Sequence, residues 1–278
     1  MEINNILVPV DFSDCSKNAL KIAIDLAKIC GAKIHMVNSI HIHTPHPDVS
    51  GGTLINSLLT DYEEQIRESF NELESDLIEL KDIPHESDRF IAYLVDAIFS
   101  ETQRKDIDLI VMGTRSDHSN IEKFVGSNTT DIIRSAEVPV LVIPESTKTF
   151  NPRKIGLASD FEGLVNFKNL AILSKFSELF DAEILIFHVA QDPTDVTVAT
   201  QKKMKELHEK FLNHKASVRT IEADTVLNGV KLFTASHKLD LLSVVPKEHS
   251  FFEKLFKKSI SKTIALNPSV PLITIPQF

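Results

Sequence analysis

The sequence contains two copies of one pattern. An apolar run followed by an Asp-Phe pair occurs at Ile6–Ser13 and again at Ile155–Glu162. A proline-containing apolar run closes the first half at Val138–Pro144, and a similar run closes the chain at Val270–Pro276. Internal repeats of this kind indicate repeated structural units. Because the fold must be common to both copies, a feature that only one copy has is a candidate for function.

Apolar runs that are typical of buried strands alternate with helical periodicity throughout the chain. Alternation of this kind predicts βαβ units and a parallel sheet covered by helices on both faces. We therefore predict an α/β protein with two Rossmann-like domains, each a five-stranded parallel sheet. The first half is predicted to have strands at 5–10, 33–39, 84–88, 109–112 and 138–143, and helices at 14–30, 53–80, 90–104 and 127–136. The second half is predicted to have strands near 153–158, 182–189, 216–221, 240–245 and 270–275.

Two offsets relate the copies. Asp108 aligns with Asp240 at an offset of 132, whereas Ala32 aligns with Ala182 at an offset of 150, so the second copy lacks about 18 residues between its second and fourth strands. Hydroxyl residues at 145–152, with Pro144 before them and Pro152 at their end, are typical of a linker. The predicted domains are therefore 1–144 and 153–278, joined by that linker.

Charge and composition exclude several classes. Residues 1–144 hold 12 Lys+Arg against 24 Asp+Glu, a net charge of −12, and residues 145–278 hold 18 against 15, a net of +3. The acidic first half argues against nucleic-acid binding. No apolar run approaches the roughly 18 residues of a membrane span. The two cysteines, Cys15 and Cys30, share one predicted helix and lie too far apart to bridge. With no export signal visible, we expect a cytoplasmic protein.

Glycines and a serine follow the predicted strand ends of the first half at a defined spacing. The pattern is Gly113-x-x-Ser116, nine residues, then Gly126-Ser127, and strand one reads Val8-Pro9-Val10-Asp11-Phe12-Ser13. This resembles the universal stress protein family, in which Gly-x-x-Gly, nine residues, Gly-Ser/Thr binds ATP. The resemblance covers nearly the whole chain, as two tandem copies, and implies a stress-response protein.

Elementary chemistry supports a phosphate site at this motif. Glycine allows backbone N–H groups to approach phosphate oxygens, and the N-terminus of the last helix adds donors and positive partial charge. Ser127 could cap that helix and donate to a phosphate, Asp11 could accept from a ribose hydroxyl or the adenine edge, and Arg115 could offset phosphate charge. The resemblance implies that the Ser39 backbone meets adenine and that Val10 lines the base pocket. The remaining candidate nucleotide-binding residues are Pro9, Met112, Gly113, Ser116, Gly126, Asn128 and Thr129.

Two departures from the family pattern bear on binding. Ser116 stands at the second glycine, where it would be strained if the backbone needs a positive φ, or would add a donor if only a small side chain is needed. In the second copy, Val245, Glu248 and Lys258 stand where Gly113, Ser116 and Gly126 stand in the first. We therefore expect the second domain to be a non-binding partner.

The histidines after strand two give a weaker signal. His41 and His43 would point the same way in an extended segment, which makes them, with His46, candidate metal ligands. The alternative is a polar loop over the nucleotide pocket. His35 and His188 are predicted to be structural. We find no catalytic motif, so we expect at most slow ATP hydrolysis and do not assign an enzyme.

Two function classes remain open. One is a stress-response protein that binds ATP, with or without Mg²⁺, in its first domain. The other is a stress-linked protein-interaction module that binds no nucleotide. In either case, the resemblance implies that strands 138–143 and 270–275, as edges of their own sheets, pair antiparallel within the chain as an internal pseudo-dimer. A homodimer of chains and an unidentified protein partner are further options that the sequence does not decide.

Overall fold

A computed structural model describes residues 1–40, 52–114, 127–159, 170–192, 196–245 and 270–276. Strands and helices alternate as the apolar patterns predict. The first half contains β1 (Asn5–Pro9), α1 (Asp14–Cys30), β2 (Lys33–Ile40), α2 (Gly52–Asp76), a 3-10 helix (Ile78–Asp82), β3 (His85–Ile91), α3 (Leu94–Arg104), β4 (Leu109–Thr114), α4 (Ser127–Ser135) and β5 (Val140–Pro144). The second half contains β6 (Lys154–Ala158), α5 (Ala171–Phe180), β7 (Glu183–Ala190), α6 (Val198–Glu209), β8 (Ala216–Glu222), α7 (Val226–His237), β9 (Leu241–Val244) and β10 (Leu272–Thr274).

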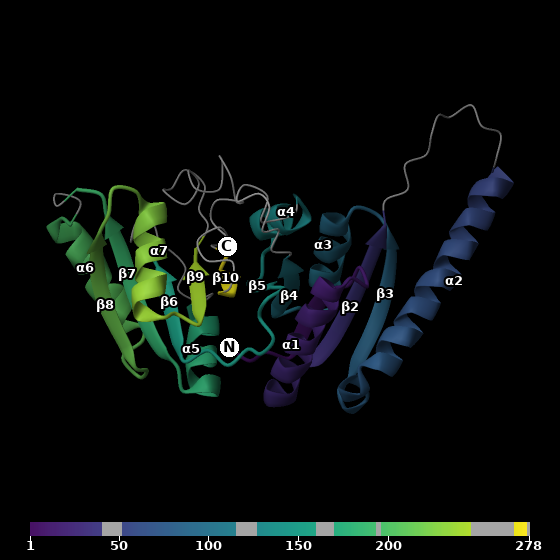
Figure 1. Ribbon diagram of the computed structural model, residues 1–278, viewed down its shortest axis with the longest axis horizontal. Helices are drawn as coiled ribbons and strands as arrows, with labels where there is room; N and C mark the ends of the chain where they lie inside the picture. Colours follow the sequence, from purple (N-terminus) through teal and green to yellow (C-terminus); the bar gives the residue numbers. More distant parts are fainter. Residues whose placement is uncertain (41–51, 115–126, 160–169, 193–195, 246–269, 277–278) are drawn as a thin grey trace.

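All ten described strands form one continuous sheet. Their order is β3-β2-β1-β4-β5-β10-β9-β6-β7-β8, which can be followed across Figure 1 from β3 on the right to β8 on the left. Every pairing is parallel except the central one, in which Val140 of β5 pairs with Thr274 of β10. The predicted antiparallel pairing of the two closing strands within one chain is confirmed. These strands are edges of their own five-stranded halves and are interior in the whole sheet.

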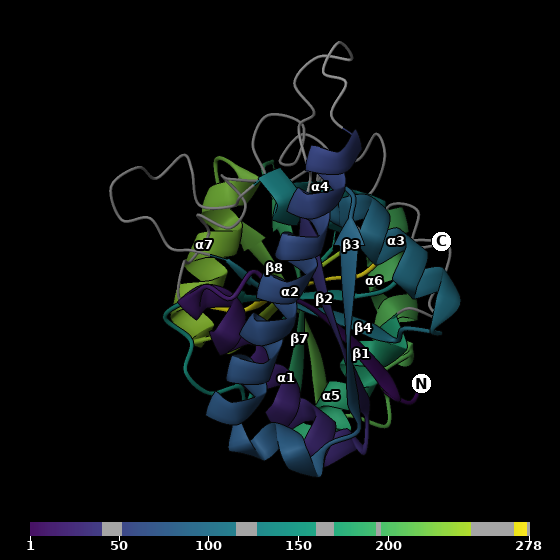
Figure 2. The same cartoon turned by 90° about the vertical axis from the view of Figure 1, so that its right-hand side faces the viewer.

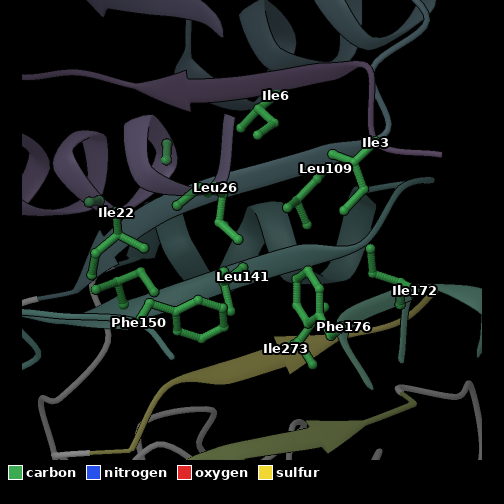
Figure 3. Close-up of a cluster of buried hydrophobic side chains, with 14 of the residues drawn as sticks. Ile3, Ile6, Ile22, Leu26, Leu109, Leu141, Phe150, Ile172, Phe176 and Ile273 are labelled. Atoms are coloured by element: carbon green, nitrogen blue, oxygen red, sulfur yellow. The ribbon is translucent and has the colours of Figure 1, made fainter. Parts of the chain in front are cut away.

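Helices cover both faces of the sheet, and each face has its own hydrophobic cluster. Side chains of α1, α2, α5 and α6 belong to one cluster, and side chains of α3, α4 and α7 belong to the other. Both clusters contain residues from both halves of the chain. Figure 3 shows side chains of the first cluster, with Leu26 and Leu141 from the first half beside Phe176 and Ile273 from the second. Burial of such side chains is the main favourable term that holds the two halves together.

The linker is part of this packing. Phe150 is buried and contacts Phe176 and Phe180 edge to face, with ring centroids 5.8 and 5.6 Å away. The Asn18 side chain of α1 donates to the Thr147 carbonyl at 2.8 Å. These contacts tie the segment between the two halves to both of them.

An aspartate before a central strand makes the same contact in each half. Asp108 Oδ2 accepts from the backbone N–H groups of Asn4 and Asn5 at 2.7 and 3.0 Å. Asp240 Oδ2 accepts from the N–H groups of Arg153 and Lys154, both at 2.9 Å. The repeated sequence thus produces repeated hydrogen bonding at the start of the first strand of each half.

Four predicted boundaries are wrong. The sequence predicts that a helix begins at Phe90, but Phe90 and Ile91 pair with Ser39 and Ile40 in the β2–β3 ladder, and α3 begins only at Leu94. The long helix α2 ends at Asp76, and a separate 3-10 turn follows it. The closing strands are also shorter than their apolar runs, because β5 and β10 begin after Pro139 and Pro271, whose rings remove a donor.

Candidate functional site

A pocket of about 430 Å³ lies at the carboxyl ends of β1, β2 and β4. This is the edge of an open parallel sheet at which ligands bind, and the volume falls in the usual range for small-molecule sites. The first turns of α1 and α4 complete the wall. The lining residues are Pro9, Val10, Asp11, Ser13, Cys15, Ser16, Ser39, Leu94, Met112, Gly113, Thr114, Asn128 and Thr129.

A tight turn between β1 and α1 forms one wall of the pocket. Phe12 has a positive φ of 61°, which is uncommon for a non-glycine residue. The turn is held by Ser13, whose Oγ donates to Asp11 Oδ1 at 2.5 Å and accepts from the Ser16 N–H at 3.3 Å. Ser13 is therefore the N-cap of α1, and it also fixes the Asp11 carboxylate at the mouth of the pocket.

Gly113 has a packing reason that is independent of any ligand. A Cβ atom at this position would lie 2.5 Å from the Cys15 carbonyl oxygen and 2.7 Å from its Sγ. Strand β4 therefore approaches the start of α1 more closely than any side chain at position 113 would allow. This close approach brings Cys15 and Gly113 together in the pocket lining.

The third wall comes from β2 and the start of α3. Ser39 Oγ donates to the Ala92 carbonyl at 2.5 Å, which ties the end of β2 to the connection before α3. Leu94, the first residue of α3, lines the pocket next to this connection. The first turn of α4 also lines the pocket, with the exposed Asn128 and the buried Thr129.

The pocket brings together most of the residues that the sequence singles out. Eight of the predicted nucleotide-binding residues line it: Pro9, Val10, Asp11, Ser39, Met112, Gly113, Asn128 and Thr129. Ser127 begins α4. Arg115, Ser116 and Gly126, together with the candidate metal ligands His41, His43 and His46, lie outside the described residues.

Five lining residues were not among the predicted ones: Ser13, Cys15, Ser16, Leu94 and Thr114. Ser13 carried a signal, because a serine just before an apolar helical pattern is a typical N-cap. Leu94 carries no such signal, because the sequence predicts that the helix begins at Phe90. Among the described lining residues none is lysine or arginine, so donors there are backbone N–H groups, hydroxyls and the Asn128 amide.

The second half repeats the framework with different side chains. Val245 stands in the position of Gly113 and is buried. His188, at the position of Asn38, makes the same bond to the first strand: Asn38 Nδ2 donates to the Val10 carbonyl at 2.7 Å, and His188 Nδ1 lies 2.9 Å from the Ser159 carbonyl. Glu248 and Lys258 lie outside the described residues. His188 is structural in this contact, as the sequence predicts.

A cluster of charged groups lies away from the pocket, at the amino ends of β2 and β3. Glu86 contacts Lys105, Lys33 and the buried His35, whose Nδ1 is 2.9 Å from Glu86 Oε1. Hydrogen bonds from Lys105 and Lys33 lower the pKa of the Glu86 carboxyl to about 2. Burial is the main reason that the pKa of His35 is lowered. The cluster lies at the amino ends of the strands, whereas the pocket lies at their carboxyl ends. Its ion pairs stabilise the position of β3, an end strand of the sheet.

Comparison with known proteins identifies the family of this chain. The model of the universal stress protein family matches residues 2–144. A relative from Thermus aquaticus, described as "Universal stress protein in QAH/OAS sulfhydrylase 3'region", is 28% identical over 139 residues, which are 50% of this chain and 96% of that protein. The chain belongs to the universal stress protein family.

Solved structures show the same fold over the full length. A universal stress protein from Archaeoglobus fulgidus aligns with a TM-score of 0.74 at 16% identity, covering 100% of both chains. A second structure, described as a putative universal stress protein from Pseudomonas aeruginosa, aligns with a TM-score of 0.59 at 14% identity, covering 99% of this chain and 93% of that one. In the described part of the chain, no helix is long and apolar enough to cross a membrane.

Proposed function

We propose that this chain is a stress-response protein that binds an adenine nucleotide, ATP in the first instance, in the pocket of its first half. The observation that supports this most is the convergence of eight motif-predicted residues on one cavity of about 430 Å³ at the strand ends. Family membership gives the stress-response role. The nucleotide is the proposal.

The chemistry of the pocket fits such a ligand. Val10, Pro9, Met112 and Leu94 offer apolar surface for a base. The Asp11 carboxylate, fixed by Ser13 at the mouth, would accept from a ribose hydroxyl. The start of α4, with Asn128 and Thr129 in the lining, would face the phosphates, because a helix N-terminus favours anions. Bound Mg²⁺ would offset phosphate charge in a half whose net charge is −12.

We further propose two tandem domains, 1–144 and 153–278, joined by 145–152. The second domain serves as a non-binding partner through the β5–β10 pairing, which is an internal pseudo-dimer. The mirrored strand order and the paired Asp108 and Asp240 contacts support this division. Val245, where the first half has Gly113, supports the loss of a site in the second.

Titration calorimetry of Mg·ATP into nucleotide-free protein tests the proposal. We expect saturable binding of one nucleotide per chain. Asn128→Glu places a carboxylate in the lining at an exposed position and should weaken binding at least tenfold, about 1.4 kcal/mol. Gly126→Lys, which copies the second half, should abolish binding. Gln201→Glu makes the same charge change on the exposed face of α6 and should leave the affinity unchanged.

Two outcomes contradict the proposal. The first is an absence of binding at millimolar ATP, which would favour the protein-interaction module instead. The second is binding that Asn128→Glu and Gly126→Lys both leave intact, which would place the nucleotide elsewhere on the chain.

A further inference from the structure

Helix α2 reaches the pocket wall around Asp11 by two routes, one through Asn38 of β2 and one directly at Phe12. Its Tyr62 hydroxyl donates to Asn38 Oδ1 at 2.9 Å, and Asn38 Nδ2 donates to the Val10 carbonyl at 2.7 Å. Its Phe70 contacts Phe12 edge to face, with ring centroids 5.1 Å apart. Val10 and Phe12 immediately flank Asp11 in the sequence.

The two contact points lie on one face of the helix. Tyr62 and Phe70 are eight residues apart, close to two helical turns. Phe70 is buried, and Ile66, between them, is buried too. Figure 2 shows α2 nearest the viewer, to the left of β3. Its contact with the turn between β1 and α1 is the Phe70–Phe12 ring pair.

The two contacts hold the backbone at Val10 and at Phe12 in place. Phe12 has its positive φ at the centre of the turn, a conformation that persists only where the surroundings hold it. The Asn38 side chain is buried, with 5% of its surface exposed. Its amide bonds to the Val10 carbonyl on one side and to the Tyr62 hydroxyl on the other. The Tyr62 hydroxyl, whose pKa is raised by burial, is the donor in this contact.

The second half contains the counterpart of the Asn38 contact. His188 makes the bond to the Ser159 carbonyl there, so a side chain that holds the end of the first strand belongs to the common framework. In the first half, the side chain at this position also accepts from the Tyr62 hydroxyl of α2, which has 25 residues, whereas the corresponding helix α6 has 12.

We infer that Tyr62, Asn38 and Phe70 are positioning residues for the nucleotide pocket, and that α2 is coupled to its occupancy. This inference rests on the proposed function. The three residues set where Val10 and Asp11 stand, and these two would contact base and ribose. By reciprocity of coupling, a ligand that needs this wall in place must stabilise the docking of α2 in return.

The test combines affinity with amide hydrogen exchange on the full chain. Tyr62→Phe removes only the hydroxyl, and Asn38→Asp replaces the donor that faces Val10 with an oxygen. Each should weaken Mg·ATP binding about 3- to 10-fold, the range of a single hydrogen bond. Phe70→Leu should weaken it similarly. In the wild type, ATP should slow exchange in α2, and in Tyr62→Phe this slowing should shrink.

Matched controls come from the second half. Ser177→Ala removes one buried hydroxyl bond, to the Ala182 carbonyl at 2.7 Å, and Phe180→Leu removes a buried edge-to-face ring. Both should lower the melting temperature as much as the test variants do, without changing ATP affinity or the ATP-dependent exchange of α2. A purely structural role for Tyr62 predicts that test and control variants behave alike.

The outcomes distinguish the two proposals. If the wild type binds no nucleotide, the proposed function fails and this inference fails with it. If the wild type binds ATP, and Tyr62→Phe and Asn38→Asp bind equally well with the same exchange of α2, the inference alone is overturned.

Discussion

Replacing Gly113 by alanine tests whether this motif glycine is required by packing rather than by a ligand. The added Cβ would lie 2.5 Å from the Cys15 carbonyl oxygen, 2.7 Å from its Sγ and 2.9 Å from its carbonyl carbon. Two of these three atoms are backbone at the start of α1, so β4 and the helix must move apart. Overpacking of this kind costs about 1–3 kcal/mol. We expect Gly113→Ala to lower the free energy of unfolding by that amount without any nucleotide present.

The assay is thermal and urea unfolding of the nucleotide-free protein. A loss of about 1–3 kcal/mol corresponds to a fall in melting temperature of roughly 3–10 °C for a chain of this size. Gly31→Ala is the control: its Cβ would meet nothing within 4 Å, but its φ is +71°, so its cost of about 1 kcal/mol is conformational only.

Cys15→Ala in the Gly113→Ala background separates the two clashes. It removes the contact with Sγ and leaves the contact with the carbonyl oxygen, so it should restore only part of the loss. The reasoning is refuted if Gly113→Ala is as stable as the wild type. Full restoration by Cys15→Ala would equally refute the claim that the backbone contact dominates.

Three further predictions concern the framework around the pocket. Asp108→Ala and Asp240→Ala each remove two charge-assisted hydrogen bonds to backbone N–H groups. Each should lower the free energy of unfolding in urea by about 1–2 kcal/mol, and the effects should add in the double variant. Unequal effects would argue against equivalent halves. Glu86 has its pKa lowered to about 2 in the folded state, so its contribution to stability is present above its ordinary pKa of 4.5 and is lost as pH falls towards 2. Glu86→Gln should therefore flatten stability against pH in that window, and an unchanged acid-unfolding profile would contradict the ion cluster. Ser13→Ala removes the α1 cap and the Asp11 contact and should cost about 1 kcal/mol in thermal unfolding, as should the N-cap variant Thr197→Ala on α6; a loss in Thr197→Ala alone would contradict the capping role of Ser13.

The parallel sheet was predictable from sequence because its signals are local and repeated, whereas the antiparallel pairing of its closing strands was implied by the family resemblance. Apolar runs that begin at Ile6 and Ile155 predict the first strand of each half. The apolar runs that begin at Val138 and Val270 predict the closing strands β5 and β10. The strand-to-helix boundary before α3 was not predictable in the same way. Phe90 and Ile91 suit either a strand or a helix, and the pairing of Ile40 with Ile91 decides between them. Tertiary pairing of this kind is invisible to periodicity.

The same boundary error hid one part of the pocket. With the helix start at Phe90, Leu94 would lie a full turn inside α3, whereas it is the first residue of the helix and lines the cavity. Cys15 was hidden for another reason: its place in the lining depends on the close approach of Gly113 from a strand about 100 residues away. The motif residues were predictable because a turn glycine, a helix cap and a strand-end carboxylate each carry chemistry in the sequence itself. Their neighbours in space do not.

Methionine methyl groups give the most direct test of nucleotide binding in the first half. Met112 lines the pocket, Met36 is in the core of the first half, and Met204 is on α6 in the second half. With ¹³C-methyl-methionine protein, Mg·ATP should shift the Met112 resonance saturably, with a midpoint that matches calorimetry, and should leave Met204 in place. A Met112 resonance that does not move at saturating ATP, or a saturable shift of Met204 instead, would contradict the account.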